Sequence, residues 1–332
     1  MFRSAKRTTA VVLAMGLAVA AGACSSSGGK KAEEQSQGVT AGKASTPAIT
    51  IAMVTHAAPG DTFWDIIRKG AESASAKDNV TLKYSSDPTS ANQANLIQSA
   101  IDSKVDGIAV TLPDPPALIP VVKKAIAAGI PVVAFNAGIT SFEQSGALAY
   151  FGSDESVAGE AAGKRAAQDG AKHVLCVVQE QGQVQLEARC DGVQKGFGGQ
   201  YDKIYVNGRD EPSVQTTIAA KLQQDKSIDM VITLGAPFAL RAIQSVKDSG
   251  SNAKVATFDF NPQIPAQIKS GSLQWAIDQQ PFLQGYSAID GIWLYKTNGN
   301  VLGGGKATLT GPYLVDKANV DFVGKFAAAG TR

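Results

Sequence analysis

The segment from Asp106 to Asn136 reads DGIAVTLPDPPALIPVVKKAIAAGIPVVAFN and decides the fold. It contains two short apolar runs, and the residues between them, from Pro116 to Ala128, predict a helix. Gly129 follows as the expected helix stop before the next strand begins. A strand, a helix and a second strand in this order are typical of doubly wound α/β domains.

The same pattern occurs a second time in the chain. Asp229 opens an apolar run, a helical segment follows, and a second apolar run ends at Asp259. Asn136 lies 30 positions after Asp106, and Asp259 lies 30 positions after Asp229. The repeat predicts two lobes of the same design, each with a polar residue at the end of the corresponding strand.

Nine apolar runs of the chain predict strands. Most of them are continuously apolar rather than alternating, which favours burial on both faces of a parallel sheet. The runs are Ile49–Val54, Val80–Tyr84, Gly107–Thr111, Pro131–Phe135, His173–Val178, Lys203–Val206, Met230–Leu234, Lys254–Phe258 and Leu273–Ile277. We therefore predict an α/β fold in which two doubly wound parallel-sheet lobes are joined by a hinge.

The lobe boundaries follow from the points where the chain is expected to cross from one lobe to the other. About 285 residues follow residue 47, which is enough for two domains of ordinary size. Crossings are expected at residues 151–153 and 278–280. The predicted N-terminal lobe comprises residues 48–152 and 281–308, and the predicted C-terminal lobe comprises residues 153–280 and 309–332.

The first residues have the composition of an export signal. Three basic residues precede an apolar run from Val11 to Ala21, which is too short to span a bilayer as a resident helix. The small residues before Cys24 resemble the lipobox of bacterial lipoproteins, although that family more often has leucine where this chain has Ala21. The resemblance implies that Cys24 is acylated. Cleavage without a lipid, and an unpaired thiol at Cys24, remain alternatives.

Residues 1–23 are therefore predicted to be a lipoprotein signal peptide. Residues 24–47 contain almost no aliphatic side chains and are expected to form a disordered tether to the cell membrane. Removing residues 1–23 takes away three basic residues, so 31 basic against 29 acidic becomes 28 against 29. This near-neutral charge gives no indication of a nucleic-acid partner. We expect an exported monomer that faces the periplasm or the cell exterior.

The remaining cysteines predict a disulfide. Cys176 and Cys190 form a pair in a chain that is expected to be exported, and their bond would join a strand to the following helix. Two buried, reduced cysteines are the alternative. With only His56 and His173 in the chain and no cysteine or histidine cluster, no metal site and no cofactor are expected.

Polar residues that follow the predicted strands are the candidates for a binding site. Ligands of open parallel sheets bind beyond the carboxyl ends of the strands. The residues found there are Thr55, His56, Asp114, Asn136, Gln179, Glu180, Asp259 and Gln279. These side chains form hydrogen bonds but do not make up a catalytic set, and they suit a ligand with many hydroxyl groups.

Aromatic and cationic residues complete the predicted site. Thr62 and Asp65 are expected to form the capping box of a helix that carries Phe63 and Trp64. Phe63 lies on the apolar face and fits core packing as well as ligand contact, whereas Trp64 is one step off that face and is predicted to stack on a sugar ring. Arg189 is expected in the first turn of a later helix, where it could bind two hydroxyls and offset a carboxylate; a solvated arginine is the alternative.

The chain resembles the periplasmic sugar-binding proteins of the ribose and galactose class over essentially all of the predicted mature domain. The resemblance is carried by DTFW (residues 61–64), GIPVVAFN (129–136), YFGSDESVAG (150–159), EAR (187–189), VATFD (255–259) and IDQQ (277–280). It implies the type I periplasmic binding fold and an ABC transporter permease as partner. It also implies ligand contacts at Asp61, Phe63, Trp64, Asn136, Arg189, Asp259 and Gln279.

Two departures from that class concern the ligand. Asn136-Ala137 stands where the class often has Asp-Arg, and Gly235-Ala236 stands where it has Asn-Asp. A polyol, a cyclitol such as inositol, or a less usual sugar is therefore expected rather than ribose or galactose. His56 and Glu180 are candidates to replace the lost contacts.

Three other functions are the alternatives to a transport protein. A carbohydrate-active enzyme would need a catalytic motif, and the sequence shows no nucleophile elbow, P-loop or metal-ligand cluster. A transcription regulator would need a DNA-binding motif where the export signal lies. A receptor that presents a furanose-type signal such as autoinducer-2 differs only in the partner that contacts the closed lobes. The mechanism expected for a transport protein is closure of a hinge over the ligand.

Overall fold

The computed structural model describes residues 43–332. The predicted signal peptide and Cys24 lie outside the described residues, as does most of the predicted tether. The chain divides into the units Met1–Ser45 and Thr46–Arg332, and the fold below is that of the second unit. No helix of the described part is long and apolar enough to cross a bilayer.

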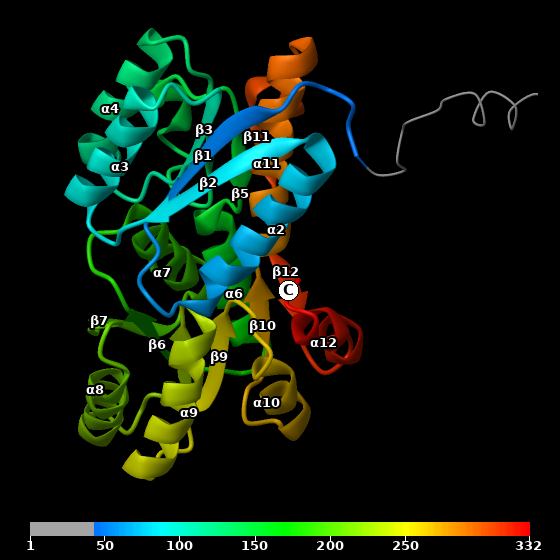
Figure 1. Ribbon diagram of the computed structural model, residues 1–332. Coiled ribbons are helices and arrows are strands. Elements are labelled where there is room, and N and C mark those ends of the chain that lie inside the picture. The colour runs from blue at the N-terminus through cyan, green and yellow to red at the C-terminus, as the bar shows by residue number, and fades with distance from the viewer. Residues whose placement is uncertain (1–42) are drawn as a thin grey trace, which may run out of the picture. The chain divides into compact units, whose positions relative to one another are not determined.

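Two six-stranded sheets form the centres of two lobes (Figure 1). The first sheet has the strand order β11-β5-β4-β3-β1-β2, and the second has the order β12-β10-β9-β8-β6-β7. The two orders correspond strand by strand, which agrees with the internal repeat of the sequence. Helices cover both faces of each sheet, so the predicted doubly wound α/β fold is confirmed.

The N-terminal lobe is built from the first half of the chain and from a later segment, α11 to β11, that comes back to it. Its strands are β1 (Ile49–Thr55), β2 (Val80–Ser86), β3 (Gly107–Val110), β4 (Val132–Phe135), β5 (Tyr150–Gly152) and β11 (Ala307–Leu309). Its helices are α2 (Thr62–Asp78), α3 (Ser90–Asp102), α4 (Pro115–Ala127), α5 (Phe142–Ser145), α11 (Pro281–Asn298) and the 3₁₀ turn η1 (Leu302–Gly305). Helices α2 and α11 cover one face of the sheet, and α3, α4 and α5 cover the other.

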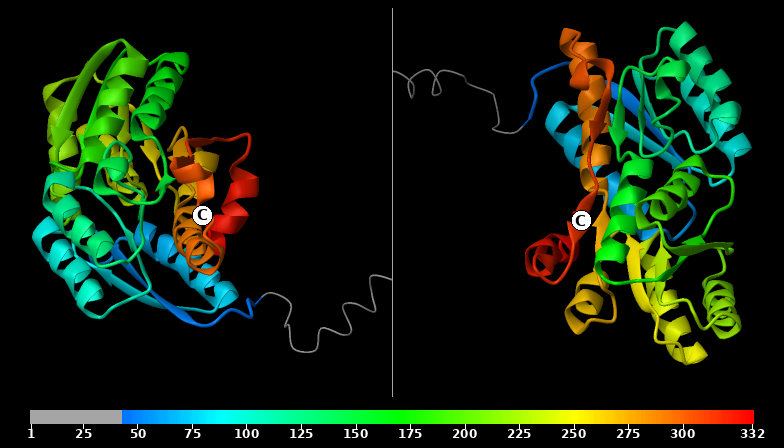
Figure 2. Two further views of the ribbon diagram at one scale, coloured as in Figure 1. Left: turned by 90° about the horizontal axis from the view of Figure 1, so that it is seen from above. Right: turned by 180° about the vertical axis from the view of Figure 1, so that it is seen from behind.

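The C-terminal lobe repeats this arrangement. Its strands are β6 (His173–Val178), β7 (Gln200–Tyr205), β8 (Met230–Thr233), β9 (Lys254–Phe258), β10 (Ala276–Asp278) and β12 (Tyr313–Val315). Its helices are α6 (Glu155–Gln168), α7 (Val184–Phe197), α8 (Glu211–Gln224), α9 (Ala236–Ser249), α10 (Ile264–Ser270) and α12 (Val320–Ala328). Figure 2 shows that α11 packs in one lobe while α12 packs beside α10 in the other.

The chain crosses between the lobes at three places. It passes from β5 to α6, from β10 to α11, and from β11 to β12. The third connection consists of the three residues between Leu309 and Tyr313, and β12 then pairs antiparallel with β10. Leu309 pairs with Gly152 in the first sheet, so the last crossing begins just after residue 309.

The structure corrects several predicted elements. Strands β5, β11 and β12 were missed because three residues carry too little periodicity to be recognised. Strands β2 and β7 are not buried on both faces, because each lies at the edge of its sheet. The side chains of β2 alternate between half-buried and exposed positions along most of the strand, and those of β7 are mostly half-buried. The N-cap of α2 is Asp61 rather than Thr62: the Asp61 carboxylate accepts from the backbone N–H of Phe63 at 3.0 Å.

Glycines bring together the two helix pairs that carry cleft residues. A Cβ at Gly285 of α11 would lie 2.0 Å from the carbonyl oxygen of Ile67 in α2, and a Cβ at Gly159 of α6 would lie 2.1 Å from the carbonyl oxygen of Arg189 in α7. Only glycine permits these approaches. The sequence therefore fixes how deeply α2 and α7 sit against their neighbours.

Candidate ligand-binding cleft

A cleft between the lobes lies beyond the carboxyl ends of the strands. It contains about 610 Å³ of space between atoms, part of which is open to solvent. Residues of both lobes line it, and the lobes touch beside it, where the backbone N–H of Val184 donates to the carbonyl oxygen of Pro113 at 3.1 Å. The described conformation is therefore closed.

Two equivalent residues of the repeat project into the cleft. Asn136 follows β4 with φ of 63°, and Asp259 follows β9 with φ of 68°. Both have left-handed backbones, which Asn and Asp adopt more readily than most residues. Asn136 Nδ2 donates to Gln284 Oε1 at 3.1 Å, and Gln279 Nε2 donates to Asp259 Oδ1. The chain positions an amide from one lobe and a carboxylate from the other at corresponding points of the cleft.

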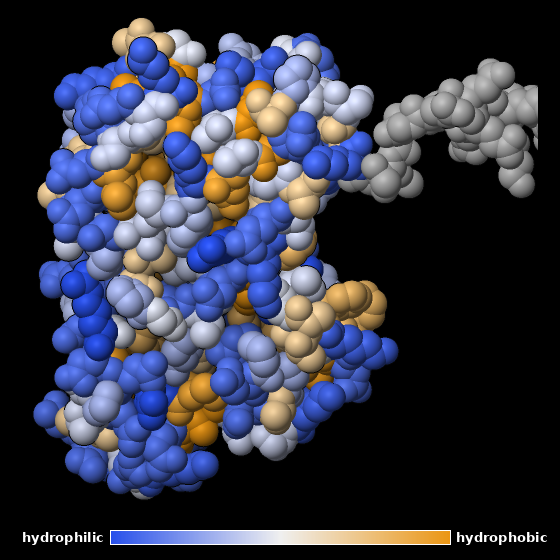
Figure 3. Space-filling view, in the orientation of Figure 1, coloured by the Kyte–Doolittle hydropathy of each residue, from blue (hydrophilic) through white to orange (hydrophobic). Residues whose placement is uncertain are grey.

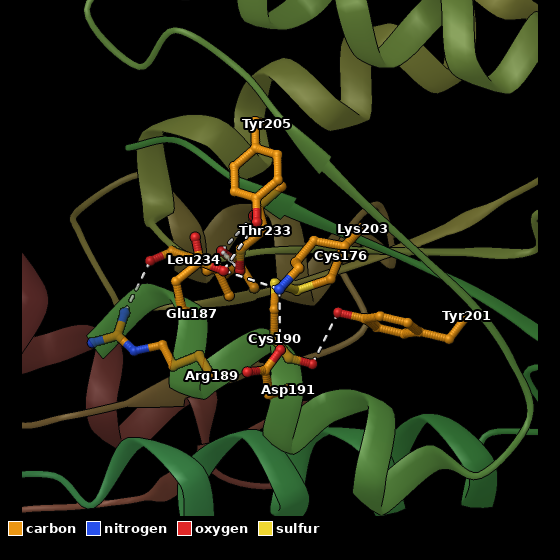
Figure 4. Close-up of a disulfide and its surroundings, with 11 residues drawn as sticks. Cys176, Glu187, Arg189, Cys190, Asp191, Tyr201, Lys203, Tyr205, Thr233 and Leu234 are labelled. Atoms are coloured by element: carbon orange, nitrogen blue, oxygen red, sulfur yellow. Dashed lines mark hydrogen bonds and ion pairs between the residues drawn. A yellow bond between two sulfur atoms is a disulfide. The ribbon is translucent and has the colours of Figure 1, made fainter. Parts of the chain in front are cut away.

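Arg189 supplies the positive charge of the C-terminal wall. Its side chain is buried and pairs with Glu155, the first residue of α6, through Nε. Nη1 donates to the carbonyl oxygen of Leu234 at 3.1 Å (Figure 4) and lies 4.0 Å from Asp259 Oδ2. The guanidinium also lies over the Phe258 ring, 5.2 Å from its centroid. A buried arginine with two carboxylate neighbours is fixed in place, unlike the solvated alternative.

Burial controls the ionisation of the carboxylates at this wall. Burial raises the pKa of Asp259 to about 7, against the opposing effects of Arg189 and Gln279. Burial also raises the pKa of Glu155, again against the charge of Arg189. Asp259 thus titrates nearer to neutral pH than a free carboxyl group, and a ligand that donates hydrogen bonds to it would favour its ionised form.

The N-terminal wall is aromatic and acidic. Trp64 is buried, with its ring centroid 4.6 Å from that of His56 and 5.4 Å from that of Phe63. Each of these contacts is edge-on. Burial raises the pKa of Asp61 to about 6, although the backbone N–H of Phe63 opposes the shift. The N-cap of α2 therefore presents a carboxylate next to a rigid aromatic cluster.

A chain of hydrogen bonds crosses the cleft. Because an ionised Glu180 can only accept, the amide nitrogen of Gln183 must face it, as found. Gln183 Oε1 accepts from Gln185 Nε2 at 2.6 Å, and the same nitrogen lies 3.1 Å from His56 Nε2. The His56 proton is therefore on Nδ1, which donates to Thr111 Oγ1 at 2.8 Å. Burial, followed by the charge of Arg189, lowers the pKa of His56 to about 3, so the ring stays neutral.

Three buried amide oxygens beside the cleft have no hydrogen-bond donor within the protein. They belong to Gln179, Gln185 and Gln279, all of which line the cleft. Gln279 is 1% exposed, and its nitrogen is already committed to Asp259. Unpaired buried acceptors are costly. A ligand rich in hydroxyl donors would satisfy them once each amide turns its oxygen toward the cleft.

The structure brings nine of the ten predicted ligand residues to this cleft. They are His56, Asp61, Phe63, Trp64, Asn136, Glu180, Arg189, Asp259 and Gln279. The exception is Asp114, which occupies the N-cap position of α4 and lines a neighbouring depression near Arg209 instead. Arg189 is the sixth residue of α7, one turn later than expected.

Sequence reasoning missed Glu155, Gln183, Gln185 and Phe238. Glu155 opens a helix and lies 34 positions from Arg189, so no local pattern links the two. The glutamines stand in the QEQGQVQ stretch that follows β6, and this density of amides was the available signal. Phe238 lines the cleft from α9.

The cysteine pair lies behind the cleft wall. Cys176 in β6 and Cys190 in α7 are paired, with their Cα atoms 5.9 Å apart, and Cys190 is next to Arg189 in the chain (Figure 4). Among the described residues, His173, Asp202 and Asp225 form a group that could hold a cation. Lys221 Nζ already pairs with Asp202 at 2.7 Å, so we assign no metal there.

These features define a two-lobed ligand-binding protein. The family model described as a periplasmic binding protein domain matches residues 51–299, and the chain belongs to this family. The family acts outside the cytoplasm and consists of binding proteins rather than enzymes, which removes the enzyme alternative.

Solved structures are similar to this chain over most of its length. A carbohydrate transporter from Acidothermus cellulolyticus 11B, crystallised in complex with myo-inositol, is 70% identical with a TM-score of 0.85, and the match covers 86% of this chain and 100% of that chain. An ABC transporter solute binding protein from Burkholderia graminis C4D1M, in complex with D-arabinose, is 22% identical with a TM-score of 0.74 over 85% of this chain and 98% of that chain. The second likeness shows the fold alone.

A curated relative supports the same class. The xylose/arabinose-binding protein XylF of Sulfolobus acidocaldarius is 28% identical over 219 residues, which is 60% of this chain and 54% of that protein. The chain thus spans about half the length of this relative. The chain is thus a periplasmic binding protein that is similar to sugar-binding proteins of transporters.

Proposed function

We propose that the protein binds a cyclitol of the inositol type between its lobes and delivers it to the permease of an ABC importer. The observation that carries this proposal is the acceptor-rich wall: Gln179, Gln185 and Gln279 offer buried oxygens without donors, beside Asp259. A cyclitol presents a hydroxyl on every ring carbon, so it can donate to several of these oxygens at once. The myo-inositol complex of the 70% identical Acidothermus cellulolyticus protein supports this choice.

The positions that depart from the ribose and galactose class also support a cyclitol. Asn136 is an amide where the class often has a carboxylate, and Ala236 is apolar where the class has an aspartate. His56 is a neutral ring that already bonds Gln185 across the cleft, so it stabilises the closed form. The ligand would meet Asn136 from one lobe and Arg189 with Asp259 from the other. Only closure completes this set of contacts.

A screen with a matched variant tests the proposed ligand. Thermal unfolding of the exported domain is measured with myo-inositol, ribose, galactose and arabinose, since a ligand at about 100 times its Kd stabilises by roughly 2.7 kcal/mol. We expect the largest rise in melting temperature with myo-inositol, and a much smaller rise for Asp259→Asn. The proposal is wrong if myo-inositol gives no rise and calorimetry finds no binding.

Hinge closure is tested by small-angle X-ray scattering. The ligand-free protein should populate an open form with a larger radius of gyration, and saturating myo-inositol should reduce that radius. Gln185→Ala removes the bond to His56 and should weaken closure without altering the lobes themselves. An unchanged radius in all samples contradicts the hinge mechanism.

We further propose that Cys24 carries the lipid anchor, that residues 1–23 are removed, and that Cys176 and Cys190 are oxidised in the exported protein. The sequence around Cys24 and the closeness of the other two cysteines support these assignments. Mass spectrometry of protein isolated from membranes should find acylation at the mature N-terminus. Free-thiol labelling should leave Cys176 and Cys190 unmodified, and labelling of both without reductant would contradict the disulfide.

A further inference from the structure

Two carboxylates enter the cleft from opposite lobes. Asp61 caps α2 in the N-terminal lobe, and Glu180 lies in the loop between β6 and α7 in the C-terminal lobe. Burial, and next the charge of Asp61, raise the pKa of Glu180. Closure therefore brings two like charges into one cleft, which a neutral ligand does not compensate.

The positive charges near this pair are committed elsewhere or exposed to solvent. Arg189 is the one cationic side chain among the described residues that line the cleft, and it already pairs with Glu155 and faces Asp259. Arg209 lies near Glu180 and opposes the rise of its pKa, but it is exposed, so solvent and salt weaken its effect. The cleft retains an excess of negative charge.

The uncharged groups of the cleft are also acceptors. The side-chain oxygens of Gln179, Gln185 and Gln279 are buried and accept no hydrogen bond from the protein. These amides stand on the same wall as Glu180 and Asp259. They indicate, as the acidic pair does, a ligand with more donors than acceptors.

We propose that the cleft prefers a cyclitol that bears a protonated primary amine, and that the ammonium group lies between Asp61 and Glu180. This inference rests on the proposed function and narrows its ligand class. An ammonium carries three donors and no acceptor. It therefore neutralises the acidic pair while the remaining hydroxyls donate to the amides. A phosphate or carboxylate substituent would add acceptors and negative charge, and it should be rejected.

The charged surroundings of the pair give this preference a pH dependence. Asp61 faces Asp65 and Trp64 on its own helix and Glu180 across the cleft, while Glu180 faces Asp61 and Arg209. The charge of Asp61 also acts on Asp259, whose pKa burial raises to about 7, so Asp259 takes up protons in the same pH range. Burial raises the pKa of Asp61 to about 6, so the pair takes up protons as the pH falls below that value. An ammonium binds the deprotonated pair. Its advantage over a hydroxyl should thus grow between about pH 5 and pH 8.

The test is calorimetric titration of the exported protein with two matched ligands. The probes are scyllo-inositol and scyllo-inosamine, which differ in one hydroxyl and carry all substituents equatorially, so the amine can be presented at any ring position. At about pH 8 we expect the amine to bind at least roughly tenfold more tightly, with a smaller advantage at about pH 5. Binding of myo-inositol 1-phosphate should be at least roughly 100-fold weaker than that of myo-inositol.

Charge-neutral variants locate the ammonium. Asp61→Asn keeps an N-cap acceptor, and Glu180→Gln keeps an acceptor for Gln183, so both preserve the local structure. Each should reduce the ratio of amine to hydroxyl affinity to near one. The control is Glu72→Gln, which removes a charge from an exposed ion pair with Arg68 on α2 and should leave the ratio unchanged.

The outcomes separate the two proposals. If no cyclitol or amine binds, the proposed function itself is wrong. If myo-inositol binds but scyllo-inosamine binds no better than scyllo-inositol, or if neither scyllo compound binds, the inference is overturned and the proposed function stands. A preference for the amine that survives both Asp61→Asn and Glu180→Gln also overturns the placement between these residues.

Discussion

Replacing Arg189 with alanine should damage the fold as well as ligand binding. The guanidinium is 3% exposed and pairs with Glu155, which is 2% exposed. Its removal leaves the Glu155 carboxylate buried without a partner and takes a charge away from Asp259. Breaking a buried ion pair from one side costs about 3–5 kcal/mol. The lost bond to the Leu234 carbonyl oxygen places this variant at the upper end of that range.

A double variant separates the two roles of Arg189. Replacing both members of a buried pair by apolar residues of similar size is often neutral. Arg189→Met with Glu155→Leu should therefore recover most of the stability that Arg189→Ala loses. Ligand binding should not recover, because the guanidinium is still missing from the cleft. Equilibrium unfolding in urea gives the stabilities, and calorimetry with myo-inositol gives the affinities.

Two results would refute this reasoning. A loss of less than about 1 kcal/mol in Arg189→Ala would mean that the pair is hydrated rather than buried. Full ligand affinity in the double variant would mean that Arg189 acts on Glu155 alone. The first result would refute the stability estimate, and the second would remove Arg189 from the ligand contacts.

Three further predictions concern other parts of the molecule. Trp64→Ala removes a buried ring that contacts His56, and it should weaken ligand affinity and stability, the latter by about 3–5 kcal/mol; unchanged affinity would assign Trp64 to packing alone. Burial raises the pKa of Asp259 to about 7 in the closed form, so this form binds more protons than the unfolded chain. The stability of the closed form should therefore fall as pH rises from about 4 to about 7, and urea unfolding of Asp259→Asn should show a shallower fall. Gly159→Ala would place a methyl group 2.1 Å from the Arg189 carbonyl oxygen, and thermal unfolding should report a loss of at least about 1–3 kcal/mol. The control is Gly170→Ala, where no atom lies near the added carbon but φ is 83°. This variant should cost about 1 kcal/mol.

An exposed apolar pair on the last helix was not visible in the sequence pattern. Phe322 and Phe326 are 63% and 42% exposed, and the α12 region of Figure 3 shows pale hydrophobic atoms. Their rings pack edge-on, 5.1 Å apart. Helical spacing alone places both on one face of α12 but cannot say whether another element covers that face. Exposure is a property of the assembled fold.

The alternation of apolar runs and helical segments was sufficient to predict the fold. Continuous Val, Ile and Ala runs are buried wherever a parallel sheet is covered on both faces, so β3, β4, β8 and β9 could be recognised from composition. The 30-residue repeat further indicated that Asn136 and Asp259 are equivalent. Strands β5, β11 and β12, of three residues each, carry no such signal, and for that reason they were found only in the structure.

The sequence by itself determined the class of the protein and most of the polar residues of its cleft, because strand ends are local features and ligands gather at strand ends. Only the tertiary structure decided the partners of these residues. The pairs Arg189 with Glu155, and His56 with Gln185, join residues 34 and 129 positions apart. Such pairs, and the pKa values that burial gives to Asp61 and Asp259, depend on which elements the folded chain brings together and how far they exclude water.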